Sequence, residues 1–72
     1  MAQTTLQSEI TGTVWKIEVR EGDSVTEEQT LMVMESMKME IPLTAPAAGV
    51  VLRLLVSEGQ TVAEGQDVAI LE

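Results

Sequence analysis

Few residues in this sequence could do chemistry. The 72-residue chain has no cysteine and no histidine, which removes the usual ligands of zinc and iron–sulfur clusters and the usual general acid–base catalyst, so no metal site is expected. One segment stands apart: Glu35–Glu40 reads E-S-M-K-M-E. It places the primary amine of Lys38, one of two lysines, between two methionines and two glutamates. Lys38 is therefore the candidate functional residue.

Local propensity alone would place Lys38 on a helix. Leu, Met, Glu and Lys are strong helix formers, and Leu31, Met34, Met37 and Ile41 fall on one helical face. Taken by itself, this window predicts an amphipathic helix that ends at Pro42. The choice of element depends on the rest of the chain.

The chain contains two copies of one unit, and the repeat overrules the helix. Residues 12–35, G-T-V-W-K-I-E-V-R-E-G-D-S-V-T-E-E-Q-T-L-M-V-M-E, align without gaps with residues 49–72, G-V-V-L-R-L-L-V-S-E-G-Q-T-V-A-E-G-Q-D-V-A-I-L-E. Stacked arrays need about three or more repeats to be stable, so two units predict a pseudo-symmetric domain whose halves bury each other's apolar faces. The identical pairs are Gly12/Gly49, Val14/Val51, Val19/Val56, Glu21/Glu58, Gly22/Gly59, Val25/Val62, Glu27/Glu64, Gln29/Gln66 and Glu35/Glu72.

Both units predict short strands joined by tight turns, because they are rich in β-branched residues and interrupted by Glu-Gly-Asp, Glu-Gly-Gln and Glu-Glu-Gln. Hydrophobic residues make up 44% of the chain and Trp15 is the only aromatic, so the core is expected to be aliphatic. The length suits one domain, residues 1–72. The pattern predicts an all-β sandwich or flattened barrel.

A bulge is expected where the apolar spacing breaks. Val14, Ile17 and Val19 are spaced by three and then two residues, and the second copy repeats this break. An extra residue in the strand would return the apolar side chains that follow it to the face that points to the core. Trp15 would then be half-buried; the alternative, that it is a core residue, is equally open.

Glycines mark turns that require a positive φ. Gly22 and Gly59 fit such positions, and Gly65 should open the last hairpin, although its counterpart is Glu28. Either the first copy uses a different turn or Glu28 is strained.

Lys38 is predicted to lie at a hairpin tip. Residues 30–35 align with the strand-like D-V-A-I-L-E, and a second strand, M-E-I-P-L-T, follows almost at once, which leaves Met37 and Lys38 for the reversal. A two-residue hairpin turn usually uses Gly, Asn or Asp, because both central residues have φ > 0. A tip that breaks this rule is a candidate functional site, with Met37 and Met39 exposed or, alternatively, one of them packed on the core.

The same register predicts the surroundings of Lys38. Ser36 should face Met39, and Glu35 should face Glu40, across the two strands. Two like charges in that position are mildly destabilising. We call Glu35, Ser36 and Glu40 the collar of the tip.

These residues resemble a known family. E-S-M-K-M in the middle, A-P-A-A-G-V-V downstream and E-G-Q-T-V-A-E-G-Q near the end are similar to the biotin carboxyl carrier family of the biotinyl/lipoyl attachment domains, over about Ile10 to Glu72. The resemblance implies a flattened β-barrel of two four-stranded antiparallel sheets related by pseudo-twofold symmetry. It also implies that Lys38 carries biotin through an amide, with Met37 and Met39 as its flanking recognition residues.

The resemblance further implies partners and a role. A biotin protein ligase would attach the biotin, a biotin carboxylase would carboxylate it, and a carboxyltransferase would pass the carboxyl group to an acyl-CoA or an oxo acid. Acetyl-CoA carboxylase in fatty acid biosynthesis is one such setting. The carrier would be a swinging arm that catalyses nothing itself.

Two features of the sequence depart from the family pattern, one residue and one missing segment. The residue before Met37 is usually alanine and is Ser36 here, a small change expected to be harmless. No extra segment interrupts Val19 to Val25, so the protruding thumb of some bacterial carriers is expected to be absent. The collar glutamates, Glu35 and Glu40, are weaker candidates for recognition by the ligase.

Other functions stay open at this point. A lipoyl carrier of an oxo-acid dehydrogenase or glycine-cleavage system would share the fold, although lipoyl domains typically show Asp-Lys-Ala. An unmodified binding module is a further alternative, in which Lys38 is an ordinary solvated lysine.

Charge and hydropathy narrow the partners and the location. The net charge of −8 argues against nucleic acid or an anionic membrane as partner. No apolar run is long enough to span a bilayer, so a cytoplasmic protein is expected. The domain itself is expected to be monomeric. Met1 and the chain length favour a free-standing protein over an excised domain.

Overall fold

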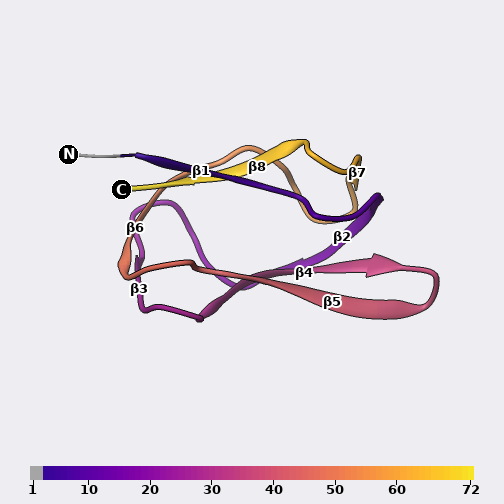
Figure 1. The fold of residues 1–72 in the computed structure, drawn as a ribbon, viewed down its shortest axis with the longest axis horizontal. Coiled ribbons are helices and arrows are strands. Elements are labelled where there is room, and N and C mark those ends of the chain that lie inside the picture. The colour runs from indigo at the N-terminus through magenta and orange to yellow at the C-terminus, as the bar shows by residue number, and fades with distance from the viewer. Residues whose placement is uncertain (1–2) are drawn as a thin grey trace.

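The computed structural model describes residues 3–72 and consists of β-strands, turns and loops (Figure 1). The predicted domain of residues 1–72 includes two residues outside this range. The helix that local propensity suggests for Leu31–Ile41 does not form, as the repeat predicted. None of the described residues belongs to a helix that could cross a bilayer. The strands are β1 (Thr4–Gln7), β2 (Gly12–Ile17), β3 (Ser24–Val25), β4 (Thr30–Ser36), β5 (Met39–Thr44), β6 (Gly49–Leu54), β7 (Thr61–Val62) and β8 (Asp67–Leu71).

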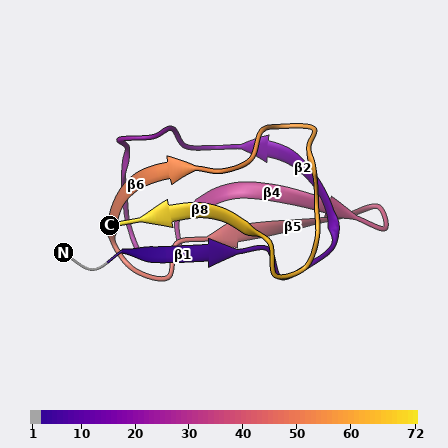
Figure 2. The same ribbon diagram turned by 90° about the horizontal axis from the view of Figure 1, so that it is seen from above.

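The strands form two four-stranded antiparallel sheets that lie over one another (Figure 2). One sheet has the order β1-β8-β6-β3 and the other β5-β4-β2-β7. Shifting each strand of the first sheet by one full repeat, the offset that places residue 12 on residue 49, gives its counterpart in the second sheet, position by position. The predicted fold and its pseudo-twofold symmetry are therefore confirmed, and the symmetry extends to β1 and β5.

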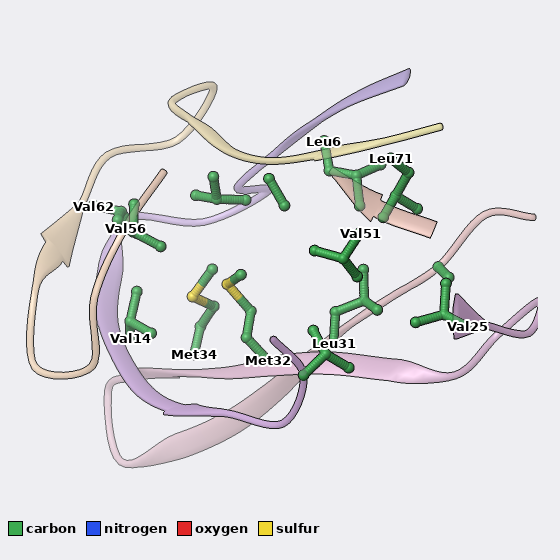
Figure 3. Close-up of a cluster of buried hydrophobic side chains, with 14 residues drawn as sticks. Leu6, Val14, Val25, Leu31, Met32, Met34, Val51, Val56, Val62 and Leu71 are labelled. Carbon is green, nitrogen blue, oxygen red and sulfur yellow. The ribbon is translucent and has the colours of Figure 1, made fainter. Parts of the chain in front are cut away.

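The core between the sheets is aliphatic, as the composition predicted (Figure 3). Equivalent residues of the two copies fill it, such as Val14 with Val51 and Val25 with Val62. The buried hydrophobic residues are Leu6, Val14, Val19, Val25, Leu31, Met32, Met34, Ala45, Val51, Val56, Val62, Val68, Ala69 and Leu71.

The predicted bulge is present in both copies. In β2, Val14 is opposite Met34 and Lys16 is opposite Val33, so Trp15 is the extra residue. The register of β6 shifts at Leu52 in the same way. Trp15 is 51% exposed, which confirms that it is half-buried and rules out the alternative of a core residue.

The turns follow the glycine pattern, with one strained exception. Gly65 has a φ of 83°, and its counterpart Glu28 has a φ of 69°. The amide of Glu28 donates to the carbonyl of Ala45 at 2.7 Å, as that of Gly65 does to Ser8 at 2.8 Å. Both copies therefore use the same turn, and the first holds a glutamate in a conformation that favours glycine.

A pair of crossed carboxylates ties the two halves together. Glu58 accepts a hydrogen bond from the amide of Ile17 at 2.8 Å, and Glu21 accepts one from the amide of Leu54 at 3.0 Å. Each glutamate lies in a turn of one copy. Its carboxylate accepts a hydrogen bond from the backbone amide at the strand end just after the bulge in the other copy.

Candidate functional site: the hairpin around Lys38

The hairpin of β4 and β5 carries the candidate residues, and Met37 and Lys38 form its turn. Their φ angles are 52° and 67°, so both lie in the left-handed region that a type I′ turn requires at its central residues. Ser36 is opposite Met39, and Glu35 is opposite Glu40. The predicted turn and register are confirmed.

The two residues of this turn, Met37 and Lys38, adopt a backbone conformation that is unfavourable for their residue types. A left-handed conformation costs a residue with a Cβ about 1–2 kcal/mol. Within residues 3–72, the non-glycine residues with positive φ are Glu28, Met37 and Lys38. Two of them are consecutive and lie at the tip, where asparagine and glycine would relieve the strain.

The tip lies at one end of the molecule. The structure measures 36 × 18 × 17 Å, and the β4–β5 hairpin extends along its long axis, away from the start of β1 and the end of β8 (Figure 1). The side chain of Met37 is 92% exposed and that of Met39 is 63% exposed. Both flanking methionines therefore lie outside the core, which excludes the alternative that one packs on it.

The amine of Lys38 is exposed and unpaired among the described residues. The ion pair found in residues 3–72 joins Lys16 to Glu18, with Nζ and Oε1 3.4 Å apart. Lys16 lies within β2, whereas Lys38 lies beyond the ends of its strands. Both lysines are exposed, but Lys16 lies on a strand beside a carboxylate and Lys38 lies at the end of a projecting hairpin.

The base of the hairpin is fixed by the corner that precedes β2. The hydroxyl of Ser36 donates to the carbonyl of Thr11 at 3.0 Å, a bond that alanine at this position would not make. A Cβ on Gly12 would lie 2.5 Å from the carbonyl oxygen of Glu35, so only glycine allows this approach. The sequence analysis missed these contacts. The signal that could have found the close approach is the identical pair Gly12/Gly49, because Gly49 approaches the carbonyl oxygen of Glu72 in the same way.

Glu35 and Glu40 form the acidic part of the collar. Both are exposed and lie opposite each other on neighbouring strands. No salt bridge joins either of them to a cation of residues 3–72. They therefore place negative charge beside the tip without fixing the position of Lys38.

A small two-sheet barrel that projects one free lysine on a strained hairpin has the design of a carrier domain, which offers a single amine to other proteins. Comparison with known families gives the same result. The model of the family described as "Biotin-requiring enzyme" matches residues 3–71, and the chain belongs to this biotin/lipoyl family.

Curated relatives of similar sequence include two bacterial proteins. A "Biotin/lipoyl attachment protein" of Bacillus subtilis is 39% identical over 85% of this chain and 84% of its own length. A "Biotin carboxyl carrier protein" of Streptococcus mutans is 44% identical over 92% of this chain. The alignment spans only 51% of that relative.

Solved structures of similar fold include domains of much larger chains. The urea carboxylase of Kluyveromyces lactis matches all of this chain with a TM-score of 0.93 and 32% identity, over 6% of its own chain. The lipoyl domain of the 2-oxoglutarate dehydrogenase complex from Azotobacter vinelandii matches 86% of this chain and 78% of its own. Its TM-score is 0.76 and its identity 27%.

Proposed function

We propose that this protein is a biotin carboxyl carrier and that Lys38 is the residue that holds biotin. The observation that carries the proposal is the position of Lys38, an unpaired amine at the tip of the one hairpin that projects from the described barrel. The matching family and the carboxyl carrier relative support biotin as the attached group.

The chemistry at Lys38 is amide formation. The Nζ atom, once deprotonated, attacks the carboxyl carbon of biotin that a biotin protein ligase has activated. The C–N bond forms, the activating group departs, and the nitrogen loses its second proton. The product is neutral, so modification removes the positive charge of the tip and lowers the net charge from −8 to −9.

After modification, the barrel carries biotin on the side chain of Lys38. Biotin supplies a ring nitrogen that accepts and releases a carboxyl group. The lysine side chain and the biotin chain together form a long arm, which keeps the ring at a high effective concentration near two successive active sites. We propose that these sites belong to a biotin carboxylase and a carboxyltransferase, and that the carrier itself is not a catalyst.

The lipoyl alternative is less favoured. The fold is shared by lipoyl domains, as the Azotobacter vinelandii structure demonstrates, but that match is weaker than the match to urea carboxylase. Met37 and Met39 on both sides of Lys38 differ from the Asp-Lys-Ala that is typical of lipoyl domains. The carrier role for biotin therefore has the better support.

The setting of the carrier is a further part of the proposal. Relatives bear names as different as urea carboxylase, pyruvate carboxylase and acyl-coenzyme A carboxylase, which fits an acceptor chosen by the transferase rather than by the carrier. We propose a cytoplasmic, monomeric barrel and take acetyl-CoA carboxylase of fatty acid biosynthesis as the first assembly to test.

The proposal is tested by coexpression with a biotin protein ligase followed by intact-mass measurement and streptavidin blotting. Wild type and Lys16→Arg should each gain one biotin, and Lys38→Arg should gain none. Lys16→Arg is the matched control, because it changes the other lysine in the same way. A lipoyl mass on the wild type, or biotin on Lys38→Arg, would contradict the proposal.

A further inference from the structure

The methionines of the hairpin divide into two environments. Met32 and Met34 are 0% and 3% exposed and point from β4 into the core between the sheets (Figure 3). Met37 and Met39, a few residues further along the chain, are 92% and 63% exposed. One short segment therefore holds two shielded thioethers and two open ones.

The open thioethers are sites at which an oxidant can react. A peroxide transfers one oxygen atom to the sulfur of methionine: the O–O bond breaks, the S–O bond forms, and the second oxygen leaves as water. The thioether is oxidised to a sulfoxide by two electrons and the peroxide is reduced. The sheets that cover Met32 and Met34 deny the same reagent access to their sulfur atoms.

The position of the open pair gives this reaction a consequence. Met37 precedes Lys38 and Met39 follows it, so an enzyme that takes the amine or its arm must approach both side chains. Thioethers adapt to several apolar surfaces. A sulfoxide is polar and chiral, and it replaces that soft contact with a group that must be solvated.

We propose that Met37 and Met39 form a reversible oxidation site that controls the docking of the carrier on its partner enzymes. The inference rests on the proposed biotin carrier function. Peroxide or another two-electron oxidant converts the thioethers to sulfoxides, and methionine sulfoxide reductases reduce the sulfoxides back to thioethers. Oxidation leaves the barrel folded, because neither side chain contributes to the buried core.

The first test measures the order of oxidation. Biotinylated protein is treated with hydrogen peroxide, and the fraction oxidised at each methionine is followed by peptide mass spectrometry while circular dichroism monitors the fold. Met37 and Met39 should be oxidised first, with Met32 and Met34 protected until the protein unfolds. Equal rates at the four positions would overturn the inference, whatever the function of Lys38.

The second test measures docking. The biotinylated carrier, before and after oxidation, serves as substrate for a biotin carboxylase, with free biotin as a control for the enzyme itself. The KM for the carrier should rise about tenfold, equivalent to ~1.4 kcal/mol of lost contact, with kcat unchanged. Sulfoxide reductases should restore the original KM.

A double variant, Met37→Leu with Met39→Leu, supplies the matched control. It keeps the apolar surface and lacks the thioethers, so its KM should be insensitive to peroxide. An unchanged KM for oxidised wild type, or an equal loss in the double variant, would overturn the inference. Failure of the unoxidised carrier to be carboxylated would instead count against the proposed function, and this result is seen before peroxide is added.

Discussion

At the scale of single residues, the two lysines of the chain differ in their surroundings. Lys16 lies within β2 and forms an ion pair with Glu18. Lys38 lies on a turn whose backbone is strained at both central residues. Strain of this kind persists where the surrounding structure enforces it and function benefits. Here β4 and β5 enforce the turn, and in the proposed function the benefit is presentation of the amine of Lys38.

Strain without a functional role should be removable. Glu28 has a φ of 69° in a turn whose counterpart is Gly65. Glu28→Gly should therefore stabilise the fold by up to about 1 kcal/mol, because the relief of the left-handed conformation outweighs the extra chain entropy of glycine. Thermal unfolding measures the change, and a lower melting temperature would contradict the strain assigned to Glu28.

At the scale of elements, the hairpin depends on its close approach to β2. A Cβ at Gly12 would meet the carbonyl oxygen of Glu35 at 2.5 Å, so Gly12→Ala must displace the base of the hairpin. We expect a loss of about 1–3 kcal/mol in stability and slower biotinylation of Lys38, measured by denaturant unfolding and by ligase kinetics.

Gly49→Ala is the control for this prediction. It creates the equivalent contact, with the carbonyl of Glu72, in the half without the hairpin. It should lower stability and leave the biotinylation rate of the folded protein unchanged. If both variants slow biotinylation equally, the support of the hairpin by Gly12 is refuted.

The crossed carboxylates give a second prediction at this scale. Glu58→Ala removes the acceptor for the amide of Ile17 and should cost about 0.5–1.5 kcal/mol. Glu21→Ala should cost a similar amount, because it removes the equivalent bond to Leu54. Glu27→Ala, at an exposed turn position, should change the free energy of unfolding little. Equal losses in the three variants would contradict the role assigned to the two crossed carboxylates.

At the scale of the whole molecule, the repeat explains both the fold and the place of the site. The two sheets have the same strand order once each strand is shifted by one full repeat. The position equivalent to the hairpin tip in the other half falls between the end of β8 and the start of β1. Within residues 3–72, the turn between β4 and β5 that holds Lys38 has no counterpart in the other half.

The repeat also sets how much of this structure could be predicted. It identified the turn at Met37 and Lys38 against local propensity, and it predicted a bulge in the strand that contains Trp15. It missed the equivalence of β1 and β5, because Thr4–Gln7 and Ile41–Thr44 share only Leu6/Leu43. The bond from Ser36 to Thr11 was also missed, since a contact between residues far apart in the chain depends on side-chain placement that no local pattern encodes.

The most direct test of the central claim is a tryptic digest of the protein after exposure to a biotin protein ligase. Trypsin cleaves after arginine and free lysine, so unmodified protein yields residues 21–38 and 39–53 as separate peptides. Biotin on Lys38 blocks that cleavage. Our account predicts one peptide of residues 21–53 that carries the mass of one biotin on Lys38. Cleavage after Lys38, with biotin absent or attached to Lys16, would contradict it.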